Sequence, residues 1–197
     1  MPVKLTAKAW LLIALLIGAT IALTWKAKAL EKRLLGDSSN SSALLNKPAP
    51  DLQMTSLSGE AVSLQSFRGK RVVDSFWASW CGPCRLELPV LQAFYEKYRG
   101  GGGATFEILA VSTDDNRSDA EKYVHEAGLR FPVLWDPQGR AQNAFGVEAI
   151  PALFVIDENG KVLSSDVGFD SSMEIKLLQR LNLKPANSSD DNDDTSD

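Results

Sequence analysis

Hydrophobic runs separated by polar turns divide the middle of the chain into short strands and helices. Three short apolar runs are typical of buried strands: residues 72–77, 106–112 and 152–156. Apolar residues at helical spacing predict a helix over residues 82–98, which the glycines at 100–103 would end. The central region therefore mixes both kinds of element, which indicates an α/β domain.

Polar caps and turns complete the predicted order of elements. Ser-Asp-Ala-Glu at 118–121 and Ser-Ser-Met-Glu at 171–174 have the form of capping boxes that open two more helices. A turn at 157–160 predicts that residues 161–168 form a hairpin with the preceding strand. The order β-α-β-α-β-β-α predicts a mixed sheet with helices on both faces. Upstream, residues 52–64 predict a small added hairpin around a Ser-Gly turn.

Composition divides the chain into four segments. We predict an N-terminal signal anchor and flank (1–34), a flexible linker (35–46), a folded domain (47–183) and a disordered acidic tail (184–197). The charge-free run from Ala9 to Trp25 has about the minimum length, roughly 17 residues, that spans a bilayer. Two alternatives are cleavage after Ala29, which ends a small-x-small sequence, and a buried core helix.

The overall charge narrows the class of partner. The net charge is -4, and no clustered basic face is visible in the sequence, which argues against binding to nucleic acid. We therefore expect protein partners. We also predict that the chain is a monomer.

The only two cysteines form the motif Cys81-Gly82-Pro83-Cys84, which follows an apolar strand and opens a predicted helix. The free backbone donors and positive dipole end of a helix stabilise a thiolate, which is the nucleophile in disulfide exchange. Cys81 is therefore predicted to attack a partner, and Cys84 to release it from the mixed disulfide. Pro83 fits because proline is accepted in the first helical turn.

Other uses of two cysteines are less well supported. A structural disulfide that closes so small a ring adds little stability. A zinc or iron-sulfur site needs more ligands than two cysteines and His125, the only histidine, can supply. Covalent haem attachment would need histidine at the position of Arg85. We therefore expect no metal and no cofactor other than a redox-active Cys81–Cys84 disulfide.

The residues around this motif resemble the thioredoxin superfamily. The resemblance rests on Phe76-Trp-Ala-Ser-Trp-Cys-Gly-Pro-Cys-Arg85 together with Glu87, Pro89 and Ile150-Pro151. Within the superfamily the chain is similar to the membrane-anchored, extracytoplasmic branch of TlpA, ResA and CcmG. Four segments point to that branch: 47–51, 69–71, 85–89 and an extra strand-helix segment within 113–145. The resemblance implies a thioredoxin-like fold with that inserted segment and the added N-terminal hairpin.

The resemblance also implies roles for residues around the cysteines. Pro151 matches the cis-proline of the superfamily, which leaves the backbone of Ile150 free to pair with an extended substrate. Trp80, with Gly82 and Pro83, would belong to the surface on which partners dock. Glu87 would exchange protons with the thiols, although a solvated helical glutamate is an equal alternative.

One position departs from the superfamily pattern. Thioredoxin has a buried acid directly before the position of Phe76, where this chain has Ser75, and Asp74 lies one residue earlier. A shift of one residue turns a strand side chain to the other face of the sheet. Glu87 is therefore the better candidate for the proton acceptor, and the sequence offers no role for Asp74.

The resemblance favours an enzyme that reduces disulfides of client proteins outside the cytoplasm, with electrons from a membrane thiol donor. Clients of this kind would include apocytochrome c or proteins with metal-site cysteines. Such an enzyme is useful where disulfides form, so we expect a single-pass protein of the cell inner membrane whose domain faces the periplasm. The alternatives are an oxidant or isomerase of secreted proteins, and a non-enzymatic tethered module that senses redox state.

Overall fold

The computed structural model describes residues 43–99 and 106–185, and six residues between 17 and 26. The chain divides into two compact units, Met1–Asp37 and Ser38–Asp197. The predicted anchor falls largely outside the described residues, as does nearly all of the predicted acidic tail. Within the described part of the chain, no helix has both the length and the apolar character needed to cross a membrane.

Seven strands form one mixed sheet in the order β2-β1-β5-β4-β3-β6-β7. The strands are β1 (Gln53–Ser56), β2 (Ala61–Ser63), β3 (Arg71–Trp77), β4 (Phe106–Ser112), β5 (Val133–Trp135), β6 (Ala152–Ile156) and β7 (Val162–Val167). β3 lies inside the sheet, parallel to β4 on one side and antiparallel to β6 on the other. The predicted mixed sheet and the added hairpin, β1 with β2, are both confirmed. β5 is the strand of the inserted segment, and it joins the hairpin to β4.

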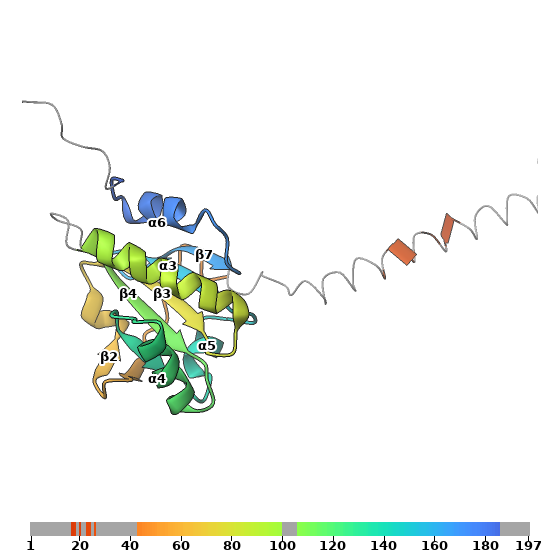
Figure 1. Ribbon diagram of the computed structural model, residues 1–197. Helices are drawn as coiled ribbons and strands as arrows, with labels where there is room; N and C mark the ends of the chain where they lie inside the picture. The colour runs from red at the N-terminus through yellow and green to blue at the C-terminus, as the bar shows by residue number, and fades with distance from the viewer. Residues whose placement is uncertain are drawn as a thin grey trace, which may run out of the picture. The chain divides into compact units, whose positions relative to one another are not determined.

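Helices cover both faces of this sheet, as predicted. They are α3 (Gly82–Arg99), α4 (Arg117–Glu126), α5 (Arg140–Ala144) and α6 (Met173–Leu181), with a short 3-10 helix, η1 (Leu64–Phe67). Figure 1 shows α3 crossing in front of β3 and β4, with α6 and α4 on either side of it. One buried apolar cluster joins the sheet to α3, α4 and α6, and a second lies on the opposite face with α5 and the hairpin.

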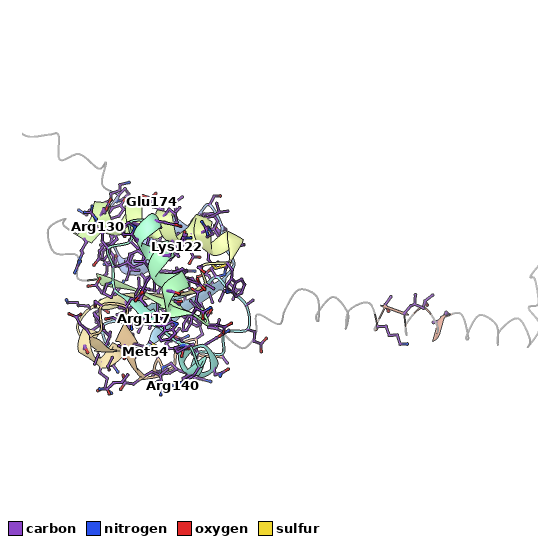
Figure 2. The ribbon with its side chains drawn as sticks, turned by 60° about the horizontal axis from the view of Figure 1, so that its bottom comes forward. Met54, Arg117, Lys122, Arg130, Arg140 and Glu174 are labelled. Atoms are coloured by element: carbon purple, nitrogen blue, oxygen red, sulfur yellow. A yellow bond between two sulfur atoms is a disulfide. The ribbon has the colours of Figure 1, made fainter. Side chains whose placement is uncertain are left out.

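The two predicted capping boxes are wrong. Helix α4 begins at Arg117, so Ser118 is already inside it, and Glu121 forms an ion pair with Arg117. Figure 2 labels Arg117 at the start of this helix. Helix α6 begins without a side-chain cap bond in the described structure, and Glu174 pairs with Lys97 of α3. In both helices, therefore, the glutamate interacts with a cation and not with the free backbone donors of the first turn.

Candidate active site

Cys81 occupies the N-cap of α3 and is joined to Cys84 by a disulfide. The Cys81 carbonyl accepts the N–H of Arg85 at 3.1 Å, and its Sγ accepts the N–H of Cys84 at 3.2 Å. A serine or aspartate cap uses its side-chain oxygen in the same way. After reduction, this backbone donor and the helix dipole would stabilise a thiolate on Cys81.

The structure brings the predicted partner-binding residues together beside Cys81. The Ile150–Pro151 peptide bond is cis, as predicted, and the Ile150 carbonyl lies 3.8 Å from the Cys81 Sγ. Trp80 is 72% exposed next to the motif. A side-chain carbon placed on Gly82 would meet no atom from another part of the described chain within 4 Å, so the surface at Gly82 is open beside Cys81, which is 5% exposed. A partner chain therefore has room to approach the disulfide.

The sequence analysis missed Asp114, which fixes the loop that leads to Cys81. Asp114 follows β4 and is 1% exposed. Its two carboxylate oxygens accept the backbone N–H of Ser79 at 3.0 Å, its Oδ1 accepts the Ser79 hydroxyl at 2.7 Å, and its Oδ2 accepts the Ser112 hydroxyl at 2.8 Å. The Trp135 indole N–H donates to the Asp114 carbonyl at 2.9 Å. The carboxylate thus ties the end of β4 to the segment before the motif.

Replacing Asp114 with alanine is expected to destabilise the protein by roughly 3 kcal/mol, because the Ser79 donors lose charged, buried acceptors. Asp114→Asn, which keeps one acceptor oxygen, should recover part of this loss. Chemical denaturation measures both variants. The exposed neighbour Asp115 serves as the control, and an Asp115→Ala loss as large as that of Asp114→Ala would contradict the assignment.

Glu87 is a buried residue of α3 and is not a solvated helical glutamate. The residue is 2% exposed, and its carboxyl accepts a hydrogen bond from the Ser75 hydroxyl at 2.8 Å. Burial raises the pKa of Glu87 from 4.5 to about 7, while the Ser75 hydrogen bond lowers it and the negative charge of Asp166 raises it. A carboxyl that titrates near neutral pH can both accept and release a proton under physiological conditions.

Asp74 points to the face of the sheet opposite Glu87, as the sequence register predicted. Its neighbours across the sheet are Leu109 and Phe154, which both belong to the second apolar cluster. The Asp74 Oδ1 has no hydrogen-bond partner among the described residues. Burial alone raises the pKa of Asp74 from 3.8 to about 7. Asp74 is therefore a buried carboxyl that does not reach the cysteines.

Metal binding finds no support in the described part of the chain, where no group of three or more His, Cys, Asp or Glu side chains is placed to hold an ion. The redox chemistry available at this site is that of the two sulfurs. The absence of a further cofactor stays a prediction.

Comparison with known proteins shows which family the chain belongs to. The sequence profile of the AhpC/TSA family matches residues 45–165, which include the disulfide, Glu87 and the cis-proline. The chain belongs to the AhpC/TSA family. This AhpC/TSA protein is 38% identical over 128 residues to the thiol-disulfide oxidoreductase ResA of Geobacillus thermodenitrificans (strain NG80-2), covering 65% of the chain and 72% of that relative.

Solved structures agree with the family assignment. A Chlorobium tepidum protein assigned as the thiol:disulfide interchange protein DsbE has a TM-score of 0.65 and 36% identity, covering 70% of this chain and 95% of that one. StoA from Bacillus subtilis has a TM-score of 0.57 and 25% identity, covering 66% of this chain and 97% of that one. The thioredoxin-like fold is confirmed. With the Cys81–Cys84 disulfide, these likenesses identify this AhpC/TSA protein as a thiol-disulfide oxidoreductase.

Proposed function

We propose that the protein reduces disulfides of client proteins outside the cytoplasm. The observation that carries the proposal is the Cys81 Sγ at the N-cap of α3, beside the Ile150 carbonyl and under an open surface. The similarity to ResA and the Gly-Pro pair between the cysteines, which resembles reducing thioredoxin, favour reduction over oxidation.

The reaction uses both sulfurs in turn. The Cys81 thiolate attacks one sulfur of the client disulfide, whose S–S bond breaks, so one client sulfur leaves as a thiolate and the other is bound to Cys81. Cys84 then gives its proton to the Glu87 carboxylate and attacks the Cys81 Sγ. The second client sulfur leaves as a thiolate. Two electrons have passed to the client, and the Cys81–Cys84 disulfide has formed.

The setting of this reaction is part of the proposal. The apolar run near the N-terminus would hold the protein in the cell inner membrane, with the catalytic domain in the periplasm. A membrane thiol carrier would reduce the Cys81–Cys84 disulfide again after each turnover. Clients with cysteines that must stay reduced, such as apocytochrome c or proteins awaiting a metal, fit an enzyme in that compartment.

The reduction potential of the Cys81–Cys84 couple tests the direction of electron flow. We expect a value near or below about -230 mV, typical of thioredoxin-like reductants. The purified full chain is equilibrated with glutathione and dithiothreitol buffers, and tryptophan fluorescence reports the fraction oxidised. A value near about -120 mV would contradict the reducing role and favour an oxidant.

A second measurement separates an enzyme from a redox-sensing module. Wild type is expected to turn over a model protein disulfide many times when dithiothreitol supplies electrons. Stoichiometric reaction without turnover would contradict the enzymatic role, whatever the potential.

A further inference from the structure

A cavity lies beside Glu87, between α3, β7 and α6. Its wall includes two buried apolar side chains and four charged groups besides Glu87: Leu153, Leu177, Asp166, Asp170, Lys176 and Arg180. The lining runs from the buried Glu87 to the exposed Asp170, so the cavity leads to the surface. The cavity volume is about 20 Å³, more than the roughly 10–15 Å³ that one water molecule needs. Glu87 can therefore contact water despite its burial.

The charges around this cavity form a chain that starts at Glu87. Asp166 of β7 faces Glu87 closely enough for its negative charge to act on that carboxyl. Arg180 of α6 donates two hydrogen bonds to Asp166 and forms an ion pair with it. Lys176, one turn earlier on α6, lies 4.0 Å from Asp166 and also pairs with Asp170. From β3, only the neutral Ser75 hydroxyl bonds to Glu87 among the described residues.

In the described structure Arg180 forms no hydrogen bond with Glu87. Its effect on the protonation of Glu87 therefore passes through Asp166. An unpaired Asp166 would repel a charged Glu87, whereas an Asp166 paired with Arg180 repels it less. We propose that Asp166 and Arg180 are positioning residues for the redox reaction, which govern the protonation of Glu87 across this cavity. The proposal rests on the proposed function, in which Glu87 accepts the proton of Cys84.

Glu87 takes up and releases one proton in each turnover, and Asp166 and Arg180 each favour one of these two steps. The S–H bond of Cys84 breaks and an O–H bond forms on Glu87 when Cys84 attacks the mixed disulfide. Before the next reduction of that disulfide, Glu87 releases the proton to water in the cavity. Asp166 favours the first step because it stabilises the protonated carboxyl, and Arg180 favours the second because it weakens the effect of Asp166.

Two substitutions that break the same ion pair are expected to shift the titration of Glu87 in opposite directions. Asp166→Asn removes a negative charge, so the pKa of Glu87 should fall by roughly half a unit or more. Arg180→Met leaves Asp166 with only Lys176, so the pKa of Glu87 should rise. Carbon-13 NMR of full-length protein labelled at glutamate measures both shifts, and Glu87→Gln assigns the signal.

A structural role would not give opposite signs, because both variants lose the same ion pair. Lys97→Met is the matched control, since it removes an exposed cation from a different ion pair of α6, Lys97 with Glu174, and should leave the Glu87 titration unchanged. Shifts of the same sign in Asp166→Asn and Arg180→Met, or no shift in either, would overturn the proposal.

The pH profile of disulfide exchange links the titration to the reaction. We expect the profile to move toward acid in Asp166→Asn and toward alkali in Arg180→Met. Opposite NMR shifts without any movement of the profile would overturn the role of Glu87 as proton acceptor, and with it the positioning role. A reduction potential typical of an oxidant would instead overturn only the proposed direction, because the titration of Glu87 does not depend on it.

Discussion

Replacing Cys84 with serine is expected to convert the protein into a trap for its partners. Cys81 keeps its backbone donor at the start of α3 and still attacks a disulfide, but no second sulfur is present to release the client. Turnover of a model protein disulfide should fall by roughly a hundredfold or more, because serine is a far weaker nucleophile than a thiolate. Mixed disulfides should accumulate at the same time.

The measurement is a turnover assay combined with non-reducing electrophoresis of the reaction mixture. Cys81→Ser is the matched control, and it should lose turnover without forming mixed disulfides. Equal amounts of trapped partner in the two variants would show that the order of attack assigned to the two cysteines is wrong.

Replacing Asp74 with asparagine is expected to stabilise the protein at alkaline pH. Above its ordinary pKa of 3.8 the unfolded chain releases the proton of Asp74, whereas the folded protein keeps it up to about 7. The stability that this group contributes is thus present at low pH and is lost as the pH rises through that window. Between pH 4 and pH 8, the free energy of unfolding should rise in Asp74→Asn relative to wild type by about 4 kcal/mol.

Urea denaturation at pH 4 and at pH 8 measures this difference. Glu87 titrates in the same direction in both proteins, so its contribution cancels in the comparison. Asp115→Asn, at an exposed position, is the control and should change the free energy of unfolding little at either pH. A gain in Asp74→Asn that is the same at both pH values would mean that the Asp74 carboxyl is not held neutral by burial.

The parts of the fold that the sequence predicted well are those with a strong local pattern. The strand at 152–156 was predicted to the residue because five consecutive apolar side chains are buried there. The strand β5 has only three residues, too few for a periodicity, and its pairing with β4 and β1 is decided by contacts distant in sequence. The capping box predicted at 171–174 is wrong for a related reason, because Glu174 forms its ion pair with another helix. In the box predicted at 118–121 the competing contact is local, an ion pair of Glu121 with Arg117 of the same helix.

In the candidate site, too, the features with a local sequence pattern were predictable and those that depend on distant contacts were not. The cysteine motif and Ile150-Pro151 are visible as short sequences, and the resemblance to the thioredoxin superfamily implied that the cis-proline lies beside the cysteines, as it does here. Asp114 carries no such signal, because its partner Ser79 lies 35 residues earlier and only the parallel pairing of β3 with β4 brings them together. The burial of Glu87 likewise depends on Ser75 and on α6, and the sequence of α3 alone does not show that either lies next to Glu87.

The hydrogen bond from the Cys84 N–H to the Cys81 Sγ also bears on the redox equilibrium. A charged sulfur accepts a hydrogen bond more strongly than the neutral sulfur of a disulfide, so this donor favours the reduced form of the couple. A couple whose reduced form is stabilised becomes a better electron acceptor and a poorer electron donor. The backbone group that helps Cys81 react quickly therefore limits how strong a reductant the pair can be.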